Sequence, residues 1–208
     1  MKKTICLLLL CLGFIQLNAQ NAEEAAVKDA FNQYKQAILA DEGENAANFV
    51  DIKTIQYYDS ILIAIRNADS VQINQMPIMD KLMVLIVRHR ANREAILNFN
   101  GRKLFVYAVE KGMVGKSSVA ANSIGKVTLN KNQATGQLLV NGTETPVNFM
   151  FYKEEGVWKV NLTSIFPMGS MALKQMIDES GEDENAYILK LLGMITGNEP
   201  SKDIWKPL

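Results

Sequence analysis

Cysteine and histidine are nearly absent from this chain of 208 residues. Both cysteines, Cys6 and Cys11, lie among the first twenty residues, and His89 is the single histidine. The remainder of the chain therefore forms no disulfide and offers too few nitrogen and sulfur ligands for a zinc site. Three adjacent acidic residues, 182–184, lack the alternating spacing of a calcium loop and suit a helix N-terminus instead. We expect no metal and no cofactor.

An excess of charge of either sign is also missing, because 22 basic residues balance 22 acidic ones. Without a basic field, we expect no nucleic-acid partner. Long apolar runs are absent beyond the first twenty residues, and none approaches the roughly 20 residues of a membrane-spanning helix. We expect a chain that is not embedded in a membrane.

The first twenty residues have the features of a Sec signal peptide. Lys2 and Lys3 precede an apolar run over 5–15, and Asn-Ala-Gln follows at 18–20. This pattern predicts export to the periplasm or beyond, with cleavage near Gln20. Lipidation at Cys11 is the less favoured alternative, because apolar residues continue past it where a lipidated chain turns polar. Cleavage leaves 188 residues with a formal charge of −2.

Residues 123–164 predict an antiparallel strand meander. Asn141-Gly142 is a strong signal for a two-residue hairpin, since both residues reach positive φ at low cost. Val147, Phe149 and Phe151 alternate with Asn148, Met150 and Tyr152, which is the period of a sheet with one buried face. By the same alternation, Trp158, Val160 and Leu162 are predicted to face the core and Lys159 and Asn161 the other side.

Helical spacing accounts for most of the rest of the chain. It predicts helices over 22–40, 51–67, 77–90 and, after Pro167, two helices that end at Gly181 and Gly197. Residues 101–112 favour helix, with a strand as the alternative. The second helix is expected to pack on the sheet, and Trp205 to hold an extended C-terminal tail. The buried faces of the first and third helices are expected to comprise Val27, Ala30, Phe31, Tyr34, Ala37 and Ile38, and Met79, Leu82, Met83, Ile86 and Val87.

Three polar or unusual segments have an ordinary structural interpretation. Residues 112–117 do not make a phosphate-binding loop, because Glu110 occupies the position of the first glycine. Arg88-His89-Arg90 fits a solvated helix end, with an anion or partner site as the alternative. Met168, Met171, Met176 and Met194 fit gap-filling core better than an adaptable binding surface.

The run Phe149-Met-Phe-Tyr-Lys-Glu-Glu-Gly156-Val-Trp158-Lys-Val, preceded by helices, resembles the nuclear transport factor 2-like superfamily, especially its secreted bacterial members. The resemblance covers about residues 22–164. It implies an α+β fold in which N-terminal helices pack on a strongly curved, cone-like antiparallel sheet with a pocket at its open end. We accordingly expect a signal peptide over 1–20, one domain over 21–164, and a C-terminal helical extension over 165–208 that packs on the same domain.

We expect this domain to be a binding protein rather than an enzyme. Superfamily enzymes of the ketosteroid-isomerase kind use an Asp or His on the inner wall of the cone, and the strands here carry neither, so no catalytic residue is assigned. The expected occupant is a small apolar ligand or a peptide in the pocket, or a protein docked on the surface. The alternative is an isomerase or hydrolase that uses a helix-borne group, for which Asp59, Asp69, Asp80 and His89 are the candidates, and the sequence leaves a homodimer open. Aromatic residues are the predicted ligand contacts, namely Tyr34, Tyr57, Tyr58, Phe149, Phe151 and Trp158.

Overall fold

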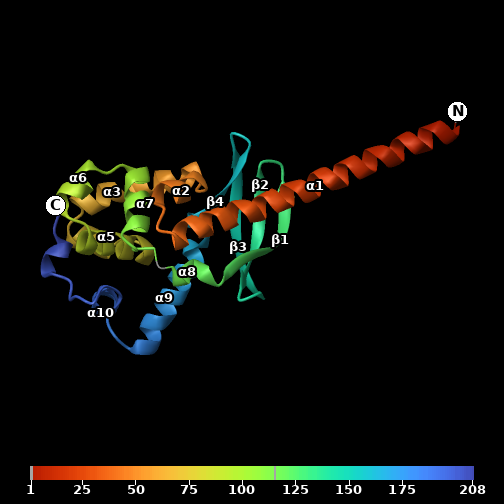
Figure 1. The fold of residues 1–208 in the computed structure, drawn as a ribbon. Coiled ribbons are helices and arrows are strands. Elements are labelled where there is room, and N and C mark those ends of the chain that lie inside the picture. Colours follow the sequence, from red (N-terminus) through yellow and green to blue (C-terminus); the bar gives the residue numbers. More distant parts are fainter. Residues whose placement is uncertain (1, 115) are drawn as a thin grey trace. The chain divides into compact units, whose positions relative to one another are not determined.

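The computed structural model describes residues 20–114, 116–117 and 119–208 (Figure 1). The predicted signal peptide falls, up to residue 19, outside the described residues, and it stays a prediction. The chain forms two compact units. The sheet unit comprises residues up to Asp51 together with Gly112–Asn161, and the helical unit comprises Ile52–Lys111 and Leu162–Leu208. The predicted division after residue 164 stays untested.

The sheet unit is built on a four-stranded antiparallel meander in the order β1-β2-β3-β4. Its strands are β1 (Asn122–Asn130), β2 (Gln133–Val140), β3 (Thr143–Glu154) and β4 (Val157–Asn161), and its helices are α1 (Lys2–Leu39), α2 (Gly43–Asn48) and α8 (Ser117–Ala120). Figure 1 shows α1 lying across the sheet. The α+β class predicted from the sequence is confirmed.

Two tight turns set the register of the meander. Asn141 and Gly142 both have positive φ, 51° and 77°, so the predicted hairpin between β2 and β3 is confirmed. Glu155 and Gly156 repeat this conformation between β3 and β4, with φ of 50° and 83°. The second turn places Lys153 opposite Trp158.

The core of the sheet unit lies between α1 and one face of the sheet. All six residues of the predicted stripe on α1 are buried, as are Phe149, Phe151, Trp158 and Val160. The predicted alternation fails at the end of β4, where Asn161 is buried and Leu162 begins a 3-10 turn, η1 (Leu162–Ile165), half-buried. Asn161 is accommodated in the core because its Nδ2 donates to Oδ2 of the buried Asp51 at 2.7 Å.

The helical unit contains α3 (Ile52–Asn67), α4 (Ser70–Asn74), α5 (Ile78–Arg90), α6 (Arg93–Asn98), α7 (Gly101–Glu110), α9 (Phe166–Ser180) and α10 (Glu184–Thr196), with the 3-10 turn η2 (Lys202–Trp205) near the end of the chain. The predicted helices, including the favoured helix at 101–110, are confirmed. Within this unit α3 packs on α5 and α7. Its expected packing on the sheet, which belongs to the other unit, stays a prediction. Gly101 permits the α3–α7 contact, because a Cβ there would lie 2.7 Å from the backbone nitrogen of Asp59.

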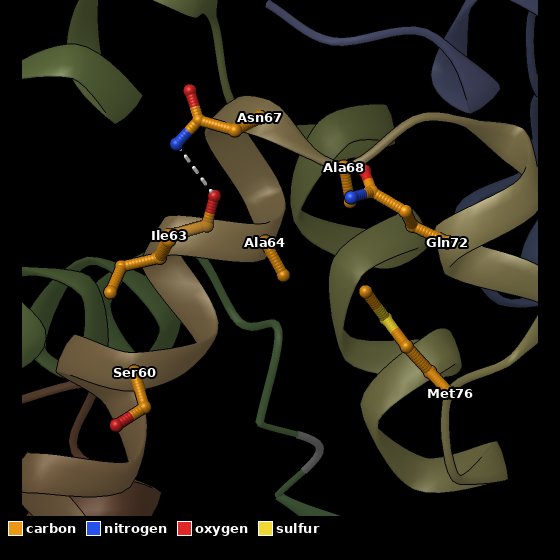
Figure 2. Close-up of a pocket in the computed structure, with 7 residues that line it drawn as sticks. All are labelled: Ser60, Ile63, Ala64, Asn67, Ala68, Gln72 and Met76. Carbon is orange, nitrogen blue, oxygen red and sulfur yellow. Dashed lines mark hydrogen bonds between the residues drawn. The ribbon is translucent and has the colours of Figure 1, made fainter.

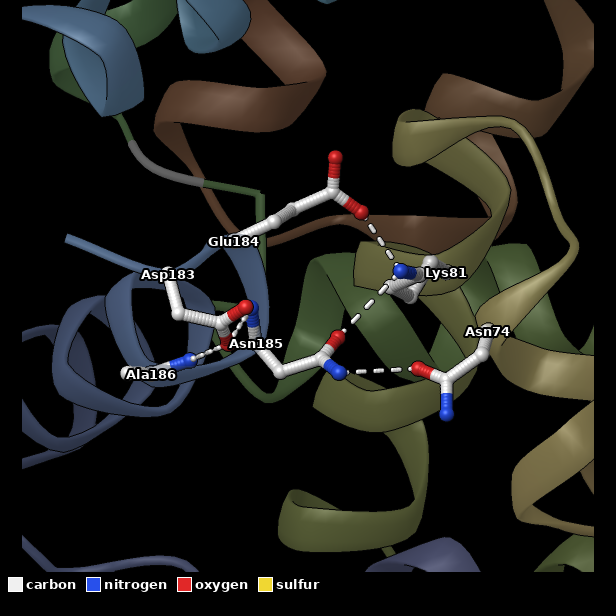
Figure 3. A network of polar contacts seen from close by, with 6 residues as sticks. All are labelled: Asn74, Lys81, Asp183, Glu184, Asn185 and Ala186. Carbon is white, nitrogen blue, oxygen red and sulfur yellow. Dashed lines mark hydrogen bonds and ion pairs between the residues drawn. The ribbon is translucent and has the colours of Figure 1, made fainter.

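The buried face of α5 differs from the predicted one. Ile78, Lys81, Val84, Leu85, Val87 and Arg88 are buried, and of the predicted set only Val87 is among them. Periodicity failed here because two of the buried residues carry charge. Lys81 donates to Glu184 and to Oδ1 of Asn185 at 3.2 Å, and Figure 3 shows how this ammonium ties α5 to the first turn of α10.

Arg88 is the second buried charge of α5, which corrects its expected place on a solvated helix end. Its guanidinium donates to the carbonyl oxygens of Ile65, Ala64 and Ala68 at the end of α3, at 2.8, 3.1 and 2.7 Å, and to that of Ile204 at 2.9 Å. The last carbonyls of a helix lack partners in the next turn, so the guanidinium supplies donors there, while the carbonyl of Ala64 also accepts the N–H of Ala68 at 2.9 Å.

The tail and the methionines also depart from expectation. Ile204 is 5% exposed and Trp205 half-buried, so Ile204 rather than Trp205 is the buried anchor of the tail. Met171, Met176 and Met194 are 65%, 48% and 63% exposed, so their assignment to the core is wrong. Leu173 and Ile177 are the residues that α9 buries.

Candidate functional site

A hollow of about 250 Å³ lies in the sheet unit between α1 and the β3–β4 hairpin. Its walls are Glu23, Ala26, Asp29 and Ala30 of α1, Phe49 after α2, and Lys153, Gly156, Val157 and Trp158 of the hairpin. The α1 residues share one side of the helix because they are spaced at three, six and seven positions. We call this space the α1–hairpin groove.

One carboxylate organises the polar wall of the α1–hairpin groove. Lys153 Nζ lies 2.7 and 2.8 Å from the two carboxylate oxygens of Glu23, and the indole N–H of Trp158 donates to Oε2 at 2.7 Å. The ammonium also lies 5.7 Å from the centroid of the Trp158 ring, within cation–π distance. Because the turn sets Lys153 opposite Trp158, a single glutamate on α1 receives both donors.

These two donors stabilise the ionised form of Glu23. The hydrogen bond from Lys153, and then that from Trp158, hold the pKa of Glu23 below its ordinary value, against a smaller opposing effect of burial. Trp158 itself is 3% exposed, so its N–H is a donor that needs a partner inside the protein. The indole is therefore fixed in place before any ligand arrives.

The groove also has one polar group left over. Asp29 lines it, is exposed, and makes no hydrogen bond or ion pair with any described residue. The remaining wall is apolar, and Val157 is 48% exposed there. The arrangement therefore offers a small apolar surface beside an unpaired negative charge, which suits binding of a ligand that carries a positive group.

The six aromatic residues predicted as ligand contacts are divided between the two units. In the sheet unit, Trp158 lines the groove, and Tyr34 and Phe149 pack on Phe31 with ring centroids at 6.2 and 5.3 Å. Phe151 is fully buried in the same core. Tyr57 and Tyr58 belong to the helical unit.

The two tyrosines of the helical unit have structural partners. The Tyr57 hydroxyl donates to Oδ1 of Asp80 at 2.8 Å, and burial followed by this bond raises the Tyr57 pKa. Tyr58 packs against Phe105 with ring centroids at 5.7 Å, and burial raises its pKa to about 12. Neither phenol titrates near neutral pH.

The four acid or base candidates also hold structural positions. Asp69 caps α4 by accepting the backbone N–H of Gln72, and Asp59 accepts that of Gly101. Asp80 accepts from Tyr57 as above. His89 Nε2 lies 2.9 Å from the hydroxyl of Thr196, in a polar hollow of about 310 Å³ that Arg90 and Asn198 also line.

A further hollow of about 310 Å³ lies between α3 and α4 and is shown in Figure 2. Its most exposed apolar residue is Ile63, at 65%. The amide of Asn67 donates to the carbonyl of Ile63 at 3.0 Å, and the oxygen of the Gln72 amide accepts the N–H of Asp69 at 3.0 Å. These polar groups of the hollow are thus hydrogen-bonded within the protein, so few remain to orient a ligand.

Glu23 and Lys153, which form the polar wall of the α1–hairpin groove together with Trp158, were not among the residues predicted from the sequence. Glu23 and Lys153 stand 130 positions apart, and each taken alone has the pattern of an ordinary surface charge. Among the described residues no cluster of His, Cys, Asp and Glu is placed to hold a metal ion, and no helix has the length and apolarity to cross a membrane. No family model, curated protein or solved structure matches the chain.

Proposed function

We propose that the protein is an exported, non-enzymatic binding protein whose site is the α1–hairpin groove, and that the groove takes a small apolar ligand or a peptide. The single observation that carries this proposal is the fixed Glu23–Lys153–Trp158 cluster beside the unpaired carboxylate of Asp29. A rigid polar wall next to exposed apolar surface needs little reorganisation on binding, which favours affinity.

Two expectations from the sequence belong to this proposal. The first is export through the Sec route with cleavage near Gln20. The second is a cone-like sheet of the nuclear transport factor 2-like kind, with α1 inside the curve and the groove at an opening. The packing of α1 on one face of the antiparallel meander supports this second expectation.

Binding is favoured over the isomerase or hydrolase alternative by how the helix-borne carboxylates are used. Asp59 and Asp69 accept backbone N–H groups, and Asp80 accepts a phenol. A carboxylate whose oxygen is taken up by such a bond is less available to abstract a proton from a substrate.

The test uses a variant that fills the groove. Ala26 lines it, whereas its neighbour Ala25 is exposed and faces elsewhere, so Ala26→Leu and Ala25→Leu are matched substitutions on one helix. The protein purified from its own cell envelope should retain a bound mass in native mass spectrometry and should bind the neutral dye N-phenyl-1-naphthylamine. We expect Ala26→Leu to lose both and Ala25→Leu to keep both. Equal binding by the two variants, or none by the unmodified protein, would overturn the proposal.

A further inference from the structure

Three ionisable side chains line the α1–hairpin groove, and their charges do not cancel. Glu23 and Lys153 neutralise each other across 2.7 and 2.8 Å, and the Trp158 N–H also donates to this carboxylate. Asp29 is the third, and no described residue donates to its side chain or forms an ion pair with it. The lining of the groove therefore carries one carboxylate that no described cation balances.

The helix α1 itself supplies no cation to Asp29. Residues three and four positions apart share a face of a helix. At those positions stand residues without positive charge, namely Ala25, Ala26, Asn32 and Gln33. Lys28 is the neighbour in sequence, but consecutive residues point about 100° apart around a helix. The Lys35 ammonium donates to the carbonyl of Asn122 at 2.9 Å. The described chain thus leaves the pairing of Asp29 to a group that a ligand brings.

The apolar surface that a ligand can touch lies beside this carboxylate. Val157 is 48% exposed, Phe49 is half-buried and Ala26 is exposed, whereas Trp158, at 3%, offers a ligand almost nothing. Ala26 precedes Asp29 by three residues, a rise of about 4.5 Å along the helix. The charge and the apolar surface are thus within the reach of one small molecule, and a hollow of about 250 Å³ limits the ligand to that size.

We propose that the groove selects a small amphiphilic cation, namely an apolar chain that ends in one primary ammonium, and that Asp29 determines this selectivity. The ammonium donates to the carboxylate of Asp29, and the chain covers Val157, Phe49 and Ala26. An ammonium is compact and carries three donors, so it pairs with a single carboxylate without the planar fit that a guanidinium needs. The inference rests on the proposed function, because it names the ligand class of the same groove.

Three ligands with the same length of apolar chain test the inference: n-octylamine, 1-octanol and octanoate. Near neutral pH the first is positive, the second neutral and the third negative. Each is titrated at low ionic strength against the full chain with bound N-phenyl-1-naphthylamine, and the concentration that displaces half of the dye is measured. The variants are Asp29→Asn and Asp29→Lys. The control is Asp178→Asn, which removes an exposed carboxylate of the helical unit.

We expect n-octylamine to displace the dye from the unmodified protein at a lower concentration than octanoate. Asp29→Asn should weaken the amine about two- to fivefold, as loss of an exposed ion pair does, and should leave 1-octanol unchanged. Asp29→Lys should reverse the order, so that octanoate becomes stronger than the amine, and Asp178→Asn should keep the original order. At an ionic strength of about 1 M, where the screening length is about 3 Å, the difference between the amine and octanoate should largely disappear.

The inference is wrong if octanoate displaces the dye as well as n-octylamine does, or if Asp29→Asn weakens the amine and 1-octanol equally or affects neither. A variant of Asp29 that loses the neutral dye altogether also contradicts it, because such a loss does not depend on the charge of the ligand. If the dye binds and Ala26→Leu abolishes its binding while the amine shows no preference for Asp29, the selectivity is wrong and the proposed function survives. If the dye does not bind to the unmodified protein, both proposals are wrong.

Discussion

Substituting Glu184 by Gln removes the anionic partner of a buried ammonium. The Lys81 side chain is 4% exposed and that of Glu184 38%, so the lysine rather than the glutamate is the desolvated member of the pair. Breaking a buried ion pair costs about 3–5 kcal/mol because one charge stays buried without compensation. Here Asn185 still accepts from Lys81, and the site of Glu184 is partly open to water. We therefore expect Glu184→Gln to lower the free energy of unfolding by about 2 kcal/mol.

Removing the other partner of the pair, the Lys81 ammonium, should change the stability very little. Lys81→Met removes the charge that needs a partner, keeps much of the side-chain volume, and leaves Glu184 exposed enough to be hydrated. A well-packed apolar residue in place of a buried ion is often neutral or stabilising. We expect a change of less than about 1 kcal/mol, and in the double variant Glu184→Gln should lose most of its effect.

Urea unfolding followed by Trp205 fluorescence, in a chain carrying Trp158→Phe, measures these differences in the helical unit. The control is Glu182→Gln, just before α10, because Glu182 pairs with Lys190, whose side chain is 55% exposed. An exposed pair of this kind contributes little, and this control should leave the urea midpoint unchanged. The reasoning is refuted if Glu184→Gln is as silent as Glu182→Gln, or if Lys81→Met is as damaging as Glu184→Gln.

Three further predictions concern other parts of the chain. Gly101→Ala should destabilise the helical unit by about 1–3 kcal/mol in the same urea assay, because a Cβ there collides with the α3 backbone. The control is Gly169→Ala, whose Cβ would meet Met79 Sδ at an ordinary contact distance of 3.5 Å, and which should be neutral or stabilising. Because the folded-state pKa of Glu23 is lowered, its contribution to stability is complete above the unfolded pKa of about 4.3 and is lost as pH falls through the lower folded value. Urea midpoints measured from pH 5 to 3 should therefore fall more steeply in the unmodified protein than in Glu23→Gln. Parallel curves for the two proteins would contradict this. Intact-mass measurement of exported protein should place the mature N-terminus within two or three residues of Gln20, and a retained signal peptide or a diacyl group on Cys11 would disprove the predicted export route.

The elements that the sequence predicted correctly depend on local patterns. The stripe on α1, the Asn141-Gly142 turn and the glycine-terminated helices α9 and α10 each follow from residues within about ten positions of one another. Helical spacing, positive φ and C-terminal capping act over that range, so they can be predicted without knowing the tertiary fold.

The face of α5 was predicted wrongly for the opposite reason. A pattern argument places Lys81 and Arg88 in solvent, because an unpaired charge is rarely buried. Glu184 lies 103 positions from Lys81, and the carbonyl of Ile204 lies 116 positions from Arg88. The partners that compensate the burial of these charges can be identified only when the tertiary structure is known.

The α1–hairpin groove combines features that follow from the local sequence with features that depend on the tertiary fold. The spacing of Glu23, Ala26 and Ala30 on α1 and the turn at Glu155-Gly156 are local features, whereas the meeting of Glu23 with Lys153 and Trp158 is not. Cleavage near Gln20, as the sequence predicts, would leave Glu23 and Glu24 in the first turn of the mature helix. Carboxylates in a first turn are stabilised by the unpaired N–H groups and the helix dipole. If the predicted cleavage takes place, the ionised form of Glu23 would therefore be stabilised further in the mature chain than in the uncleaved one.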